Sequence, residues 1–250
     1  MALKALLFGS LDTLADTHDA QRRAFNEAFD AAGLDWHWEP GAYDRLIDRA
    51  GNASRVQEYA RQVGHTLSDE ERDTVQRERI LRYGRLLGDL DVQLRPGVDR
   101  LVNVALGEGR KIALVSNAER EMVDAFQEHF GDRLPMNEFA YVGDITAGAP
   151  KPDPEPYRVA LHAMALGTDE AVAIEDTGYG LRSALAADLT AIAVPTDFTR
   201  EQDFSGAAAL VDSLGTIQEP ARSLRVPVPM EDDIVTLDYL QGLIVLAEAA

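Results

Sequence analysis

Short, continuous apolar runs alternate along this chain with longer stretches that have helical periodicity. Strands buried on both faces have this continuous pattern, because helices cover both sides of a parallel sheet. Five runs of four to six residues have it: 3–8, 111–115, 139–142, 171–174 and 190–194. The pattern therefore predicts the α/β class, with a doubly wound (Rossmann-like) parallel sheet as its core.

A helical insertion is predicted after the first run. Apolar residues recur at helical spacing over residues 20–32, and a glycine follows them. Further on, Ser68 and Glu71 have the spacing of a capping box, which indicates a helix beginning at the next residue. About 100 residues separate the first two apolar runs, and no strand pattern lies between them. Residues 17–90 are therefore predicted to form an α-helical cap.

The C-terminal segment has a different pattern. Three prolines between residues 216 and 233 predict an extended connection. A single helical face then carries Ile234, Leu237, Leu240 and Ile244. We expect this helix to pack on the protein's own core, with a homodimer contact as the alternative. The predicted units are an α/β core (1–16 and 91–215), the helical cap (17–90) and a C-terminal extension with one helix (216–250).

Composition narrows the choice of partners and location. The 250-residue chain has a formal net charge of -19, and such a surface repels nucleic acid and anionic membranes. No run of about 18 uncharged apolar residues exists that would cross a membrane. The absence of cysteine excludes disulfides, thiolate metal sites and cysteine nucleophiles. The N-terminus resembles a strand more than an export signal, so we expect a cytoplasmic protein.

Polar residues follow four features of the predicted sheet, at the edge where open parallel sheets bind ligands. The first strand leads into FGSLDTL, and the second leads into Ser116 and Asn117. Lys151 lies on the proline-rich turn GAPKPDPEPY, and the fourth strand ends in Glu175 and Asp176. No single one of these motifs is specific. The four motifs in this order, with a helical insertion after the first, together make a specific signal for the fold.

This order of motifs resembles the haloacid dehalogenase-like hydrolases, and the resemblance covers residues 1 to about 220. The segments LRPGV, KPDPEPY, EDTGYGLRSALAA and DSLG are similar to the branch of CbbY-type sugar phosphatases and β-phosphoglucomutase. The resemblance implies an aspartyl-phosphate mechanism, in which one Asp attacks phosphorus, a second Asp moves the proton, and Mg²⁺ bridges nucleophile and phosphate. Phosphoryl transfer depends on such positioning and charge neutralisation, and its covalent step needs a carboxylate.

The resemblance also implies roles for residues outside the first motif. Phosphate oxygens would be bound by Ser116, Asn117 and Lys151, and weakly bound Mg²⁺ by Asp176 and Glu175. For Asp176, capping of the following helix is the alternative. Arg55 falls where the cap places a basic residue towards the substrate. Gln21 falls where related chains often carry histidine, and we expect it only to pack.

The first motif departs from the family at its chemical positions. Gly9 aligns with the nucleophile, Leu11 with the acid/base, and Asp12 with the motif's glycine. Glycine has no side chain to phosphorylate, and leucine cannot move a proton. We therefore expect a catalytically impaired protein that binds a small phosphorylated metabolite, although whether it is an enzyme stays open. The alternatives are a hydrolase in which Asp12 or Asp16 activates water beside Mg²⁺ at Asp176, and a structural protein that assembles through its C-terminal helix.

Overall fold

The computed structural model describes residues 2–47, 52–143 and 148–249. Its described strands form a seven-stranded sheet in the order β3-β2-β1-β4-β5-β6-β7. They are β1 (Ala5–Phe8), β2 (Lys111–Val115), β3 (Phe139–Val142), β4 (Ala171–Glu175), β5 (Thr190–Ala193), β6 (Ala209–Val211) and β7 (Ser223–Arg225). Neighbouring strands are parallel except for β7, which runs antiparallel to β6. The predicted α/β class with a mainly parallel sheet is confirmed.

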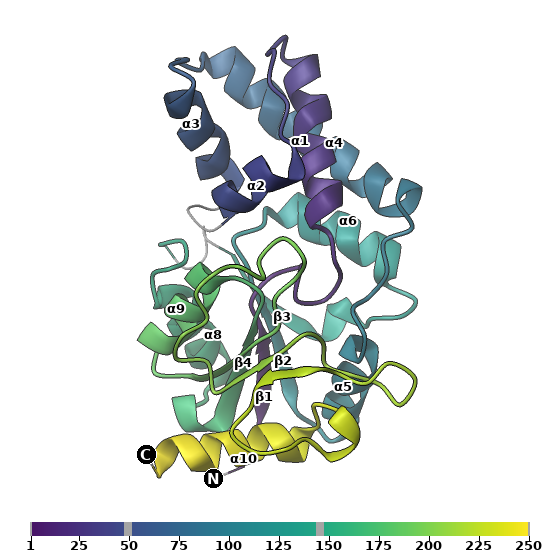
Figure 1. The fold of residues 1–250 in the computed structure, drawn as a ribbon, viewed down its shortest axis with the longest axis vertical. Helices are drawn as coiled ribbons and strands as arrows, with labels where there is room; N and C mark the ends of the chain where they lie inside the picture. Colours follow the sequence, from purple (N-terminus) through teal and green to yellow (C-terminus); the bar gives the residue numbers. More distant parts are fainter. Residues whose placement is uncertain (1, 48–51, 144–147, 250) are drawn as a thin grey trace.

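Two layers of helices enclose the sheet (Figure 1). One face is covered by α5 (Val98–Gly107), α6 (Arg120–Phe130) and α10 (Leu237–Glu248), and the other by α8 (Glu155–Met164) and α9 (Gly178–Ala186). Alternate residues of β1 belong to different layers: Leu6 and Phe8 face the first, and Leu7 faces the second. A strand covered on both sides must be apolar throughout, which explains why the five longer strands could be predicted.

Four helices follow β1 and group at one end of the molecule, beyond the carboxyl ends of the strands (Figure 1). They are α1 (His18–Ala31), α2 (Pro40–Ile47), α3 (Asn52–Gln62) and α4 (Asp69–Asp89). The capping box is confirmed, since Ser68 and Glu71 cap each other's backbone at the start of α4. No described residue between 17 and 90 lies in a strand. The division into a core, a cap and an extension stays a prediction.

The edge of the sheet differs from the prediction. β6 and β7 were not predicted, because three-residue segments carry too little apolar sequence to be distinguished from a loop. β7 lies inside the segment that we expected to be an extended connection. Beyond it, α10 buries Leu237, Leu240 and Ile244 against the same core as β1. The structure therefore supports packing of this helix on its own core. None of the described helices has the length and apolar character needed to cross a membrane.

An ion pair connects α4 with α6. The fully buried Arg79 places Nη2 2.5 Å from Oε1 of Glu119, the residue that precedes α6. The same guanidinium lies over the ring of Phe25, on α1. Burial raises the pKa of the Glu119 carboxyl, but the charge and hydrogen bond of Arg79 outweigh it, and the pKa is lowered. The pair therefore contributes to stability where Glu119 is ionised.

Replacing Glu119 with Gln will lower the free energy of unfolding by about 3 kcal/mol at pH 7, because a buried guanidinium loses its counter-charge. The pKa is lowered in the folded protein, so this contribution is present above the ordinary carboxyl pKa and is lost as pH falls through the folded value. Urea unfolding of wild type and variant at pH 7 and pH 4 will show the difference shrinking in acid. The exposed pair of Arg120 and Asp124 provides the control, since Asp124→Asn should change little. A difference that does not vary with pH would contradict this account.

Candidate functional site

The carboxyl ends of β1, β2 and β4 bring the predicted residues together. β1 pairs with β2 on one side and with β4 on the other, so the residues that follow these strands share one edge of the sheet. A small cavity of about 30 Å³ lies at this edge. Its lining consists of Gly9, Ser10, Leu11, Asp12, Gln21, Arg55, Ser116, Asn117, Ala118 and Tyr179. Such a volume holds one or two water molecules.

Glu175 fills the space in front of residue 9. A Cβ on Gly9 would lie 2.1 Å from Cδ of Glu175, and a Cβ on Gly180 would lie 2.1 Å from its Oε2. Two glycines thus leave room for this carboxylate. Nζ of Lys151 donates to Oε1 of Glu175 at 2.5 Å and to the carbonyl of Gly9 at 2.8 Å. The hydroxyl of Tyr157 donates to the same carboxylate oxygen.

The pair of Lys151 and Glu175 is buried, with side chains 2% and 1% exposed. Burial raises the pKa of Glu175 and lowers that of Lys151, while each charge opposes the shift of the other. In a buried ion pair, removing one partner leaves the other charge uncompensated, which destabilises the fold. The Lys151 ammonium is therefore engaged with Glu175. Its predicted contact with phosphate would require this pair to open.

The magnesium site implied by the resemblance does not fit these residues. Gly9 offers no side-chain oxygen. The carboxylate of Glu175 occupies the space next to Gly9 and Gly180 and pairs with Lys151. Mg²⁺ requires near-octahedral geometry with oxygen ligands in fixed positions. Of the expected side-chain ligands, only Asp176 lies outside the ion pair of Lys151 and Glu175. The alternative role for Asp176 as a helix cap is not seen, because Thr177 accepts the hydrogen bond from the N–H of Gly180.

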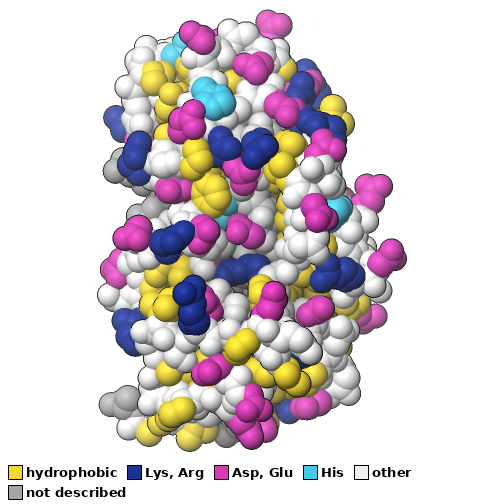
Figure 2. Space-filling model, turned by 45° about the vertical axis from the view of Figure 1, so that its right-hand side comes forward, with side chains coloured by type: hydrophobic (Ala, Val, Ile, Leu, Met, Phe, Trp, Pro, Cys, Tyr) yellow, Lys and Arg dark blue, Asp and Glu magenta, His cyan; other side chains and the backbone are white. Residues whose placement is uncertain are grey.

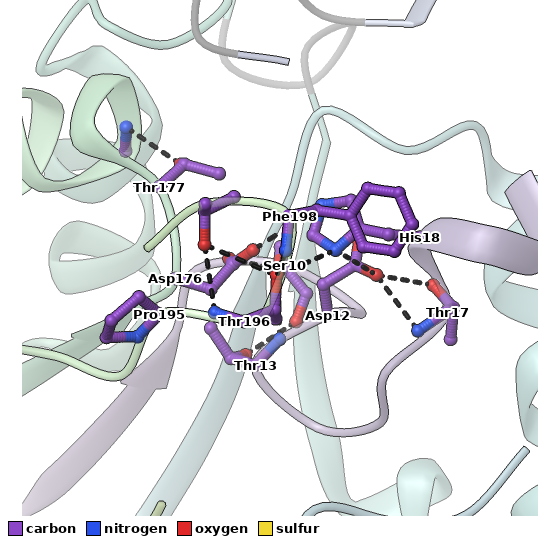
Figure 3. A network of polar contacts seen from close by, with 12 residues as sticks. Ser10, Asp12, Thr13, Thr17, His18, Asp176, Thr177, Pro195, Thr196 and Phe198 are labelled. Atoms are coloured by element: carbon purple, nitrogen blue, oxygen red, sulfur yellow. Dashed lines mark hydrogen bonds and ion pairs between the residues drawn. The ribbon is translucent and has the colours of Figure 1, made fainter. Parts of the chain in front are cut away.

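Asp176 instead belongs to a second buried cluster, with Asp12 and His18 (Figure 3). Nδ1 of His18 lies 3.2 Å from Oδ1 of Asp12, and Nε2 lies 3.8 Å from Oδ2 of Asp176. The hydroxyl of Ser10 donates to Oδ1 of Asp176 at 2.6 Å. The other oxygen, Oδ2 of Asp176, is buried and has no hydrogen-bond partner among the described residues. The cluster joins the end of β4 to the first residue of α1.

Asp12 is held in place by the start of α1. Its Oδ1 accepts hydrogen bonds from the backbone N–H and the hydroxyl of Thr17, at 3.1 and 2.7 Å. Its Oδ2 accepts from Nε2 of Gln21 at 2.8 Å. The expectation that Gln21 only packs was wrong, because its amide is a hydrogen-bond donor to this carboxylate. These bonds orient Asp12 towards α1 and His18.

Burial sets the charge states in the cluster. It lowers the pKa of His18 to about 4, so the imidazole is neutral at pH 7. Burial raises the pKa of Asp12, while hydrogen bonds from Thr17 and Gln21 oppose the rise. Burial also raises the pKa of Asp176, and the nearby charge of Asp12 adds to the rise. Two carboxyl groups with raised pKa values therefore share a buried space with a neutral imidazole.

Hydrogen-bond donors that follow β2 or belong to α3 line the same cavity. The hydroxyl oxygen of Ser116 accepts from the N–H of Ala118 at 3.1 Å, which leaves its own hydrogen for another acceptor. Oδ1 of Asn117 accepts from the N–H of Lys151 at 3.3 Å, while its buried Nδ2 has no partner among the described residues. Arg55 reaches the same cavity from α3. The predicted Ser116, Asn117 and Arg55 thus line one cavity.

Sequence reasoning missed several residues of this site. His18, Ser10 and Tyr157 were not singled out, although each bonds to or contacts a predicted residue. A signal existed for His18, because it begins the first helix six residues after Asp12 and both follow the same strand. Tyr157 ends the KPDPEPY segment, but no local signal marks its pairing with Glu175, which lies 18 residues further along the chain.

Known proteins similar to this chain were found by sequence and by structure. The haloacid dehalogenase-like hydrolase family matches residues 3–188. The protein CbbY of Cupriavidus necator is 35% identical over 225 residues, which cover 87% of this chain and 88% of that protein. This chain belongs to the haloacid dehalogenase-like hydrolases. CbbY of Rhodobacter capsulatus is also 35% identical to this chain. The match spans 212 residues, which cover 83% of this chain and 92% of that protein.

Solved structures agree with this family assignment. The crystal structure of CbbY from Rhodobacter sphaeroides, in complex with phosphate, matches with a TM-score of 0.77 and 32% identity, covering 84% of this chain and 94% of that one. β-Phosphoglucomutase from Clostridium difficile, at 18% identity and a TM-score of 0.73, shares the fold over 99% of this chain and 100% of that one. The resemblance to the CbbY-type branch of the family is confirmed.

Proposed function

We propose that this member of the hydrolase family binds a small phosphorylated metabolite and does not process it through an aspartyl-phosphate. The observation that carries the proposal is the position of Glu175. Its carboxylate fills the space in front of Gly9 and is neutralised by Lys151, so no free carboxylate faces the cavity from that position. Leu11, at the position of the acid/base residue, is a buried part of the hydrophobic core and carries no proton.

The polar groups that line the cavity support binding of phosphate oxygens. Ser116 and Asn117 offer a hydroxyl and an unpartnered amide, and Arg55 adds positive charge to the same cavity. Local donors of this kind are needed, because the chain has a net charge of -19. The face in Figure 2 carries many acidic side chains but is hollowed at mid-height, where Lys or Arg side chains lie.

The similar proteins support the chemical class of the ligand. CbbY of Rhodobacter sphaeroides has been crystallised with phosphate, and a mutant of it with xylulose-(1,5)bisphosphate. We infer a phosphorylated sugar as the ligand class here. Since the cavity of about 30 Å³ is too small for one, α1–α4 would act as a cap that opens to admit it.

The test combines binding and turnover. Calorimetric titration with inorganic phosphate and with a panel of sugar phosphates will show binding, and Asn117→Ala will weaken it by about tenfold, as expected for losing one hydrogen bond to a charged group. Asn103→Ala is the matched control, since Asn103 is exposed on α5. Phosphate release by wild type will stay near background. A kcat on the order of 1 s⁻¹ would overturn the non-catalytic assignment, and equal binding by Asn117→Ala would overturn the site.

A hydrolase that uses Asp12 is the second candidate. One observation favours it: Asp12 lines the cavity and lies beside the neutral imidazole of His18, an arrangement that can accept a proton from water. If wild type does release phosphate, Asp12→Asn will abolish the release in this case. Release that survives Asp12→Asn would exclude Asp12 as the base.

A further inference from the structure

We propose that Asp12, His18 and Asp176 form a binding site for a divalent first-row transition metal ion such as Zn²⁺ or Mn²⁺. The site differs from the magnesium site implied by the family resemblance, because it uses an imidazole and leaves out both Gly9 and Glu175. It also goes beyond the proposed metabolite binding, since none of its side chains is among the proposed phosphate ligands.

The spacing of the three side chains suits an ion. One oxygen or nitrogen from each lies within 4.8 Å of the others. The ring of His18 faces the two carboxyl groups with different nitrogens, since Nδ1 lies 3.2 Å from Asp12 and Nε2 lies 3.8 Å from Asp176, and an ion would bind one of these nitrogens. Metal–ligand bonds of about 2.0–2.2 Å place neighbouring ligands roughly 3–3.5 Å apart. Closing separations of up to 4.8 Å to this spacing requires side-chain shifts on the order of 1 Å.

A second observation points to a cation at the same place. Oδ2 of Asp176 is buried and lacks a hydrogen bond among the described residues, while its ion-pair distance to the ring of His18 is 3.8 Å. A buried carboxylate oxygen without a partner is unfavourable. A cation between Asp176, Asp12 and His18 would provide that partner and would favour the ionised form of the two buried carboxyl groups.

Surrounding groups already orient the ligands. Ser10 holds the other oxygen of Asp176, and Thr17 and Gln21 hold Asp12. The hydroxyl of Thr196 lies 3.3 Å from Nδ1 of His18, which leaves Nε2, the nitrogen that faces Asp176, to bind the ion. Such hydrogen bonds to the outer side of ligands fix their geometry in metal sites, and losing them commonly costs 10- to 100-fold in affinity.

The ligand set favours transition metals over magnesium. Imidazole is a good ligand for zinc, iron and nickel, whereas Mg²⁺ prefers oxygen ligands alone. His18 is neutral and so able to coordinate. Arg55 and Arg95 lie close enough to act electrostatically on His18, and their charges oppose a cation. We therefore expect affinity in the micromolar range.

The experiment is a metal titration of protein that has been stripped with chelator, in the absence of any phosphate compound. Calorimetry will show about one equivalent of Zn²⁺ bound, at least tenfold more tightly than Mg²⁺. Co²⁺ will give visible absorption bands that report on coordination by a nitrogen ligand. His18→Gln will weaken Zn²⁺ binding at least tenfold, and so will the near-isosteric Asp176→Asn, with folding checked by circular dichroism. His162→Gln, at an exposed position on α8, will bind as wild type does.

Three results would overturn the proposal. They are no binding of Zn²⁺, Mn²⁺ or Co²⁺ by folded wild type, equal binding by His18→Gln and Asp176→Asn, and a loss in His162→Gln as large as in His18→Gln. If either site variant fails to fold, the Co²⁺ spectrum of wild type decides, because a spectrum without nitrogen coordination excludes His18. The titration contains no phosphate ligand, so a negative result leaves metabolite binding untouched, and failed metabolite binding leaves the metal site untouched.

Discussion

Replacing Lys151 with Met will destabilise the folded protein by about 3–5 kcal/mol at pH 7, because it leaves the buried carboxylate of Glu175 without a counter-charge. Among the described residues, only the hydroxyl of Tyr157 would still donate to that carboxylate. Replacing Glu175 with Gln will also destabilise, since the Lys151 ammonium is equally buried. The double variant Lys151→Met with Glu175→Gln will lose less than the sum of the two single losses, because it removes both charges at once.

Urea unfolding of the four proteins gives the coupling energy between the two residues. Lys4→Met is the control, because Lys4 is 53% exposed and pairs with Glu170 at the surface, where an ion pair contributes about 0–1 kcal/mol. Strict additivity of the two core substitutions would show that the pair does not stabilise the fold. It would also remove the reason for regarding Lys151 as engaged with Glu175.

Rebuilding the first motif with Gly9→Asp, Leu11→Asp and Asp12→Gly will produce phosphatase activity if Glu175 can leave its place. The Cβ of residue 9 would otherwise lie 2.1 Å from the Glu175 carboxyl. The contact is with the end of a flexible side chain, so we expect Glu175 to swing away and to release Lys151. With Mg²⁺ added, kcat should rise from background towards the order of 1 s⁻¹.

Two variants make the rebuilding test specific. Gly9→Asp alone should recover far less activity, because residues that act as one catalytic unit are strongly non-additive. Gly9→Ala brings in the same Cβ without a carboxylate, so it should give no activity and should cost about 1–3 kcal/mol of stability by overpacking. A folded triple variant without any gain on phosphate esters would show that the site has diverged beyond its first motif. A Gly9→Ala protein as stable as wild type would show that Glu175 already has another place to go.

Local sequence patterns determined the framework of this protein. Continuous apolar runs marked the strands that are buried on both faces, and helical spacing marked the insertion after β1. Ser68 and Glu71 marked the start of α4 because both sides of a capping box lie within one turn. The order of polar motifs after the strands placed the site at the carboxyl edge, since parallel strands end on the same side. β6 and β7 were not predicted because a three-residue strand carries too weak a sequence pattern.

The tertiary structure alone decided how the side chains of the site are paired. The ion pair of Lys151 and Glu175 joins residues 24 positions apart, and it forms because Gly9 and Gly180 leave the volume that the carboxylate fills. Asp176 and His18 meet because β4 lies beside β1 in the sheet, although 158 positions separate them in the sequence. Neither pairing has a local signal. A sequence pattern reports what each segment buries, whereas the partner of a buried charge depends on which segments the topology places side by side and on the space left between them.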